Sequence, residues 1–340
     1  MRKYWVRLLL LFTLFCCSVF TSAATVRDLH NVRVPVLDQS EASRTDAIGG
    51  AFQQVLIKVS GTRDVLDNAV LMGEQAKAKS YISSLRYERD ATNQLQLSVT
   101  FMSAPLQVLL ESADAPIWGA SRPLTQLWIA ENTGEERAVV GVDNKLWYHE
   151  LQMAMDARGL PVIFPTWDLE DEMALPVASL WGLFEQDIER AVDRYASDGY
   201  AAGRIIQIGN EFNFSGYLTY SKSREIIDVS AASIPLLANQ IAGSIAESLS
   251  DRYAVVALKG VDSGYVLRVS GVQGFSSYRA LMDYLSAHVG VREARLVKAE
   301  GDTLTLALEL TGSWQQVWDV LALDQKLIRS DTPGLYAWQP

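Results

Sequence analysis

The sequence contains almost no cysteine and little histidine. Its two cysteines, Cys16 and Cys17, are neighbours within an apolar run near the N-terminus. A chain that has lost this run would have no cysteine, which excludes disulfide bonds, thiol nucleophiles and cysteine ligands for zinc. The three histidines are too widely separated to form a zinc-binding motif, and they stand at His30, His149 and His288.

Motifs that identify common enzymes are also absent. The chain has no G-x-S-x-G, H-E-x-x-H, G-x-G-x-x-G or phosphate-loop pattern, so hydrolases and nucleotide-binding enzymes lack their usual anchors. His149 falls on the apolar side of a predicted helix, where a hydrogen-bonded structural histidine is more common than a catalytic base. We therefore expect no cofactor and no metal site, and the sequence favours a protein that is not an enzyme.

Long apolar runs are missing except at the N-terminus. Residues 8–20 are apolar, follow a basic segment and precede small residues that end at Ala24. These three regions form a secretory signal peptide, which we place at residues 1–24 with cleavage near Ala24. An uncleaved anchor is the alternative, but the run is shorter than the roughly 20 apolar residues that a spanning helix needs. We expect export across the inner membrane to the periplasm, with no membrane insertion after cleavage.

Basic residues are outnumbered by acidic ones. The full chain has a net charge of −10, and loss of the three basic residues of the signal peptide makes it −13. Nucleic acids and anionic lipids bind through basic patches, so we expect neither as a direct partner. A large net charge also discourages self-association, and we expect a monomer.

Apolar periodicity divides the exported chain into three parts. We predict a mixed α+β and α/β fold, with a central α/β sandwich-type domain at 120–255 between two βαββα modules of ferredoxin-like order at 25–115 and 256–340. The two flanking hairpins alternate in the same way, with Leu95, Leu97, Val99 and Phe101 in the first and Leu304, Leu306, Leu308 and Leu310 in the second. A true repeat explains this match, and convergent alternation is the alternative.

The central domain begins with a strand, helix, strand unit. An apolar run at 127–130 is followed by a predicted helix at 145–158, a stop at Gly159 and a second apolar run at 160–164. Ligands of α/β sheets gather beyond the carboxyl ends of strands, so we expect the functional face in loops 131–136 and 166–172. The acidic residues at 168–172 could bind a hard cation, but they lack the glycine and spacing of calcium loops, and a solvated acidic loop is preferred.

Four residues are candidates for partner binding: Trp167, Asp168, Arg122 and Trp128. Trp167 follows the rigid Pro165 and precedes Asp168, so its ring would be a preorganised anchor of the kind that dominates protein interfaces. The alternative is a tryptophan that folds back over the edge of the sheet.

Several short segments resemble a known group of proteins. They are Arg122-Pro123-Leu124, Trp128-Ile129-Ala130, Arg158-Gly159-Leu160-Pro161, Pro165, Asp168, residues 191–195 and Tyr253. They look like an uncharacterised family of exported gammaproteobacterial proteins classed as a domain of unknown function. That resemblance covers most of the exported chain and implies its location, but no activity.

The element order of the central domain is also similar to the amino-terminal domain of the Tol-Pal protein TolB, the curli secretion protein CsgG and the flagellar H-ring protein FlgT. These likenesses imply a role in envelope assembly. We therefore expect a non-enzymatic periplasmic protein that binds or scaffolds other envelope proteins. The alternative is a periplasmic hydrolase or small-ligand-binding protein with a pocket near Asp168, in which Arg122 and a histidine converge.

Overall fold

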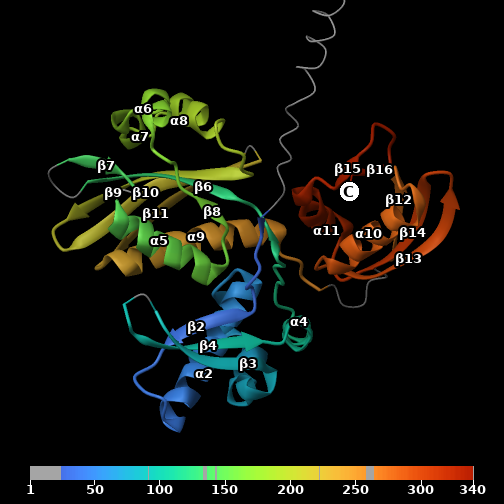
Figure 1. Cartoon of the computed structure of the whole chain (residues 1–340), viewed down its shortest axis with the longest axis horizontal. Coiled ribbons are helices and arrows are strands. Elements are labelled where there is room, and N and C mark those ends of the chain that lie inside the picture. The colour runs from blue at the N-terminus through green and yellow to red at the C-terminus, as the bar shows by residue number, and fades with distance from the viewer. Residues whose placement is uncertain are drawn as a thin grey trace, which may run out of the picture.

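The computed structural model describes residues 24–90, 92–132, 136–141, 144–221, 223–257 and 264–339. The expected signal peptide lies outside the described residues except for Ala24, and so do both cysteines. Figure 1 shows three groups of elements, each with helices and a sheet, so the predicted mixture of α and β structure is confirmed. None of the helices in the described ranges has the length and apolar character needed to cross a membrane.

The N-terminal module has a three-stranded antiparallel sheet in the order β2-β4-β3. Among the described residues, β2 lies at an edge of this sheet, where it pairs with β4, and it contains Pro35, which cannot donate to a further strand. Between β2 and β3 the chain forms one long helix and three short ones. The elements are β2 (Asn31–Pro35), α2 (Glu41–Ser60), η2 (Asp64–Asp67), α3 (Ala69–Gly73), η3 (Gln75–Tyr81), β3 (Ile82–Arg89), β4 (Leu95–Phe101) and α4 (Ser103–Ser112).

Helix α2 forms the core of this module. Its N-cap is Ser40, whose hydroxyl accepts from the Ser43 N–H. It ends at Gly61, whose φ of 86° places it in the left-handed region that favours glycine. Its apolar face, with residues three and four positions apart, is buried through Ile48, Phe52, Val55 and Val59.

The central domain has a six-stranded sheet in the order β11-β10-β9-β6-β7, with β8 paired to the start of β6. Strand β6 is parallel to β8 and β9, and the other pairs are antiparallel. The strands are β6 (Thr125–Asn132), β7 (Arg137–Val139), β8 (Val162–Ile163), β9 (Gly199–Ile208), β10 (Glu211–Tyr220) and β11 (Ser223–Ala231).

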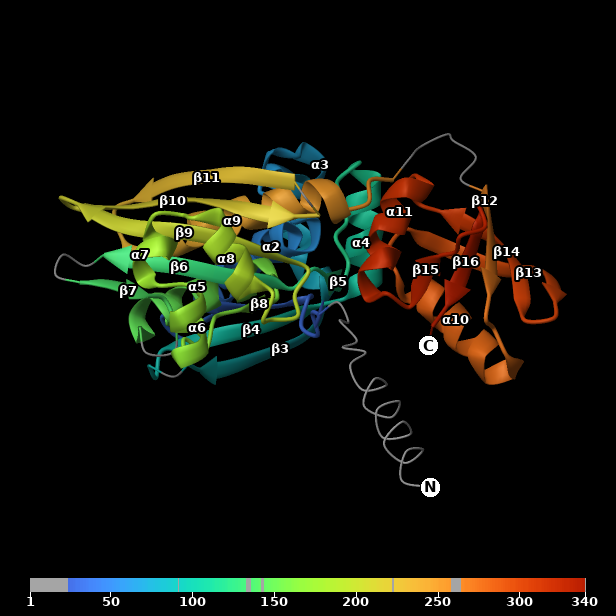
Figure 2. The ribbon, with the colours of Figure 1, turned by 90° about the horizontal axis from the view of Figure 1, so that it is seen from above.

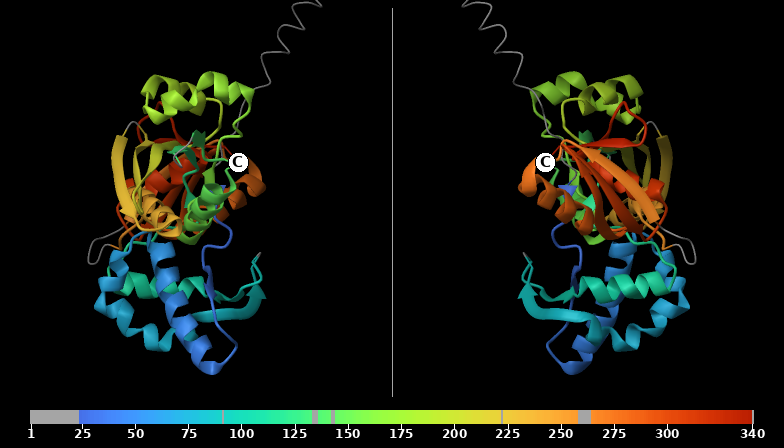
Figure 3. Two further views of the ribbon diagram at one scale, coloured as in Figure 1. Left: turned by 90° about the vertical axis from the view of Figure 1, so that its left-hand side faces the viewer. Right: turned by 90° about the vertical axis from the view of Figure 1, so that its right-hand side faces the viewer.

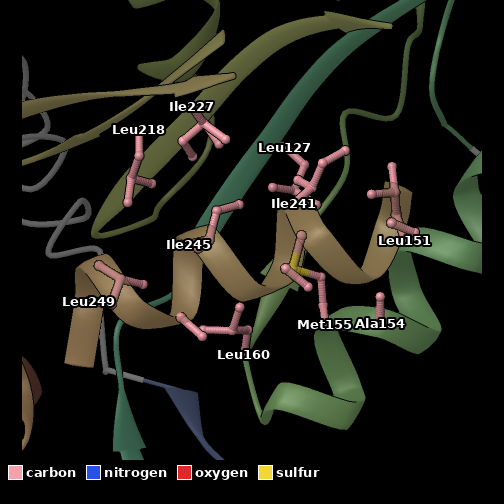
Figure 4. Close-up of a cluster of buried hydrophobic side chains, with 14 of the residues drawn as sticks. Leu127, Leu151, Ala154, Met155, Leu160, Leu218, Ile227, Ile241, Ile245 and Leu249 are labelled. Atoms are coloured by element: carbon pink, nitrogen blue, oxygen red, sulfur yellow. The ribbon is translucent and has the colours of Figure 1, made fainter. Parts of the chain in front are cut away.

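Helices cover both faces of this sheet (Figures 1 and 3). Two long helices, α5 (Lys145–Arg158) and α9 (Ile234–Tyr253), lie on one face, and three short ones, α6 (Leu169–Ala174), α7 (Val177–Trp181) and α8 (Glu185–Val192), lie on the other. Figure 4 shows the first face, where Ile241, Ile245 and Leu249 of α9 pack between the sheet and α5. The four-residue spacing of these side chains makes the buried stripe of α9.

The C-terminal module has a five-stranded sheet in the order β13-β14-β12-β16-β15. Its first three strands have the same order as those of the N-terminal module, with the third strand between the first and second. Two short strands that the sequence analysis missed extend the sheet beyond β12: β16 pairs with β12, and β15 pairs with β16. The elements are β12 (Gly264–Ser270), α10 (Gly274–Ala287), β13 (Val291–Glu300), β14 (Thr303–Leu310), α11 (Trp314–Leu321), η4 (Ala322–Asp324), β15 (Leu327–Arg329) and β16 (Leu335–Trp338).

The ferredoxin-like description stays a prediction beyond this shared order. A complete ferredoxin-like module places a fourth strand beside the first. The described part of the N-terminal module has three strands, and in the C-terminal module the neighbour of β12 is β16, which is parallel to it.

Short contacts join the three groups. Strand β1 (Ala24–Thr25) pairs with β5 (Ser121–Arg122), and Ile117 bridges Val255. Ser121 Oγ donates to Asp324 Oδ1 at 2.8 Å, and Asp324 Oδ2 lies 3.0 Å from His288 Nε2. The segment around 117–122 therefore contacts elements from all three groups.

Replacement of Gly61 tests the junction between α2 and the central domain. A Cβ atom at Gly61 would lie 2.2 Å from Ser250 Cβ and 2.8 Å from Trp118 Cε3, in a left-handed conformation. We expect Gly61→Ala to lower the free energy of unfolding by about 2–4 kcal/mol, measured by urea denaturation. Gly50→Ala, within α2, is the matched control, because nothing lies within 4 Å of a Cβ atom at Gly50. A similar loss of unfolding free energy in both variants would contradict this account.

Candidate functional site

The acidic segment that follows Trp167 is the start of helix α6. Asp168 is the cap, and its Oδ1 accepts from the backbone N–H groups of Glu170 and Asp171 at 3.1 Å each. Glu170, Asp171 and Glu172 occupy the first turn, where carboxylates are favoured by the helix dipole. The run of acids therefore has a local structural cause.

Arg194, just after α8, neutralises this helix start. Its Nη1 and Nη2 donate to the two carboxylate oxygens of Asp168 at 2.6 Å each, and Nη1 also donates to Asp171 Oδ1 at 2.7 Å. Asp171 is wholly buried, and its Oδ2 accepts from the Trp167 N–H at 2.9 Å and the Tyr195 hydroxyl at 2.6 Å. The network holds α6 against the end of α8.

This geometry makes Asp168 a poor base. The hydrogen bond from Arg194, followed by the one from the Asp171 N–H, lowers the pKa of Asp168 to about 2. A general base works best with a pKa near the operating pH. The described ranges also contain no group of three or more His, Cys, Asp or Glu side chains placed to hold a metal ion. The predicted site residue Asp168 is thus engaged in helix capping and ion pairing.

Trp167 lies partly in the core and partly at the surface. Its φ of 52° is unusual for a residue with a side chain, and the bond from its N–H to buried Asp171 holds it there. The half-buried ring packs against the hydrophobic cluster under α6–α8, while Leu169 and Met173 on α6 are 70% and 69% exposed. We call Trp167, Leu169 and Met173 the Trp167 patch.

Trp128 does not reach the surface. Its side chain is 0% exposed, its Nε1 donates to Gln126 Oε1 at 2.8 Å, and its ring meets the Tyr195 ring edge-on with centroids 5.9 Å apart. Gln126 in turn donates to the Val192 carbonyl at 3.1 Å. Trp128 therefore packs in the core and, through Gln126, is linked to the end of α8. Its assignment as a partner contact is corrected.

Arg122 is also inside the protein. Its guanidinium is 0% exposed, lies 4.0 Å above the Trp118 ring and donates to five backbone carbonyls. The acceptors are the carbonyls of Lys58, Trp118, Gly119, Arg158 and Gly159. No partner can contact a side chain enclosed in this way, so its assignment as a partner contact is corrected as well.

The two predicted loops leave the sheet at different levels. Strand β8 pairs with Thr125 and Gln126 at the start of β6, so segment 166–172 follows a strand that ends near the start of β6. The Tyr195 hydroxyl accepts a hydrogen bond from the Thr166 N–H, and the Tyr195 ring packs against Trp128. The other loop follows Asn132 at the carboxyl end of β6, and residues 133–135 of it lie outside the described ranges. The Trp167 segment therefore lies over a face of the sheet and does not extend from its carboxyl edge.

Sequence reasoning missed a surface groove in the N-terminal module. It has a volume of about 670 Å³ and lies between η3, α3 and α4, with Val70, Glu74, Tyr81 and Val108 among its lining residues. Val108 and Val70 are 65% and 51% exposed. The signal available was Val108 in the apolar run of α4, which has more apolar residues than one buried face requires.

Arg122→Met tests whether Arg122 holds the N-terminal module and the central domain together. The substitution leaves five buried carbonyls without their charged donor, so we expect the free energy of unfolding to fall by about 3–5 kcal/mol in urea. Arg33→Met is the control, because Arg33 pairs with Glu88 while its side chain is 57% exposed, and exposed pairs contribute about 1 kcal/mol or less. Equal losses would contradict the assignment of Arg122.

The capping network predicts a response to acid. Because the pKa of Asp168 is lowered from 3.8 to about 2, its ionised form stabilises the folded state above the unfolded pKa, and this stabilisation is lost as pH falls through about 2. Stability measured by urea unfolding between pH 2 and pH 5 should fall less steeply in Asp168→Asn than in the wild type. Parallel curves would show that the Arg194 pair contributes nothing.

Comparisons with known proteins cover only part of the chain. No curated protein and no solved structure matches it. Residues 23–119, which include the whole N-terminal module, match a family described as a domain of unknown function, DUF8605. The expected resemblance to an uncharacterised domain is therefore confirmed for this part.

Proposed function

We propose that the chain is exported to the periplasm and acts there, without catalysis, by binding or scaffolding other envelope proteins through the Trp167 patch. The observation that supports this proposal most is the exposure of Leu169 and Met173 beside a half-buried tryptophan. Hot spots of protein interfaces combine an aromatic anchor with a well-packed surround.

Rigidity is the second support for the proposal. Asp168, Asp171 and Arg194 fix the first turn of α6, and the Trp167 N–H is part of the same network. A surface that is already ordered loses less side-chain entropy on binding. The Trp167 patch thus has the properties of a preformed anchor.

The hydrolase or ligand-binding alternative has less support. Among the described residues, Asp168 bonds Arg194, whereas Arg122 bonds carbonyls at the junction of modules. Burial, followed by the nearby charges of Lys58 and Arg122, lowers the pKa of His30. Asp168 is therefore engaged at α6, away from the junction where Arg122 and His30 lie.

Crosslinking in intact cells tests the proposal. A photoreactive residue at position 169 should give an adduct with another envelope protein, and one at position 146 should not, because Leu146 is 58% exposed on α5 at the opposite face. Trp167→Ala should abolish the adduct. Because Trp167 is only half-buried, we expect this variant to lose less unfolding free energy than the roughly 3–5 kcal/mol that removal of a fully buried tryptophan costs.

Two results would count against the proposal. Adducts of the same protein from both positions would mean that the patch is not selective. A full 3–5 kcal/mol loss in Trp167→Ala with the adduct retained would make Trp167 a core residue only.

A further inference from the structure

We infer that the outer edge of β11 pairs antiparallel with β11 of a second copy of this chain, with Ile226 of each copy at the centre. This inference concerns a different surface from the Trp167 patch and does not depend on the proposed function. It also departs from the monomer that the net charge predicts.

Strand β11 is an unusually open edge. It pairs with β10 over nine residues without a bulge, and Figures 2 and 3 show it at the outside of the central domain. The other edge strands are protected in the ways natural sheets use. Strand β13 has two register shifts, β3 has one and β2 contains a proline, while β7 and β15 have three residues each. Among the edges in the described ranges, only β11 is both long and regular.

The side chains on one face of β11 are exposed. Ile226 pairs with Tyr217, which lies on the α6–α8 face of the sheet, so Arg224, Ile226 and Asp228 share that face. All three are exposed, and Ile226 reaches 78%. An exposed isoleucine between opposite charges at the same strand edge is an arrangement suited to strand pairing.

The charges select one register. In a closed dimer the two strands pair with themselves, so one residue faces its own copy across the two-fold axis. When that residue is Ile226, the isoleucines meet and each Arg224 lies opposite Asp228 of the other copy. A central Glu225 or Asp228 would place like charges opposite each other, which destabilises a sheet. A central Ile227 would oppose Ile226 to Asp228 and give no ion pair.

Arg224 is already oriented for this contact. Its guanidinium lies 4.2 Å above the Tyr217 ring and pairs with the carboxylate of Glu185 at the start of α8. Tyr217 and Glu185 fix the side chain on the α6–α8 face beside the strand. A second carboxylate from Asp228 of another copy would therefore meet a cation that loses little freedom on binding.

Charge exchange tests the register. The purified exported protein should dimerise as its concentration rises, measured by sedimentation velocity or light scattering. Asp228→Arg and Arg224→Asp should each weaken the homodimer by at least about tenfold, because both ion pairs become repulsive. A mixture of the two variants should recover the dimer, because each Arg then faces an Asp across the strands.

Hydrophobic and control variants complete the test. Ile226→Lys should give a monomer, whereas Ile208→Lys should not, because Ile208 is 63% exposed at the end of β9 in the same sheet. Circular dichroism and melting curves establish that each variant folds. A wild type that stays monomeric at its highest soluble concentration, or a mixture that fails to recover the dimer, would overturn the inference. A crosslinked envelope protein at position 169 with a monomeric wild type would leave the proposed function standing and remove only the dimer.

Discussion

The burial of Arg122 is the constraint on which the arrangement of the N-terminal and central parts depends. A guanidinium taken out of water must donate hydrogen bonds to protein acceptors, or its desolvation outweighs the contacts it makes. Here the acceptors include carbonyls at the C-terminal ends of two helices: that of Lys58 in α2, and those of Arg158 and Gly159 at the end of α5. Helix C-termini carry partial negative charge, so one cation stabilises both ends at once. Neither helix can shift without leaving donors of Arg122 unpaired.

Other cations gather at the same junction and show how tightly it is closed. Lys58 donates to the carbonyls of Asp28 and Asn31, and Arg158 pairs with Glu247 of α9. Burial, with the charge of Arg122 second, lowers the pKa of Lys58 to about 8. The side chain is still mostly protonated at neutral pH. Backbone carbonyls therefore provide most of the compensation in a protein whose surface is strongly acidic.

Local patterns in the sequence predicted local structure well. The face of α2, the spacing of α9 and the alternation of β4 and β14 are periodic because each buries one side, and such periods are visible without a structure. Strands β15 and β16 were missed because three and four residues carry no period that can be recognised. The end of α2 is also visible in the sequence, because Gly61 is the residue type that a left-handed stop favours.

The candidate site was predicted less well, because its contacts join distant parts of the chain. The sequence identified Asp168 as a loop carboxylate, but its partner Arg194 lies 26 residues away, and no pattern links the two. Arg122 looked like a free cation for the same reason, since its acceptors are backbone carbonyls that any residue type provides. Trp128 belonged to a strand buried on both faces, where an aromatic residue is ordinarily core.

In the folded chain, the charged residues that the sequence suggested as site residues pair with groups of the same chain, and apolar side chains are left exposed. The cations at the junction and the acids of α6 are paired within the chain, whereas Leu169, Met173 and Ile226 remain exposed. Net charge acts at long range and is screened within about 10 Å at ordinary ionic strength, so it opposes the approach of two copies more than their contact. Contact is decided by neighbours at a strand edge, where Ile226 lies between Arg224 and Asp228 on the α6–α8 face of β11. A strongly acidic chain can therefore associate through a strand edge whose α6–α8 face carries one charge of each sign, Arg224 and Asp228.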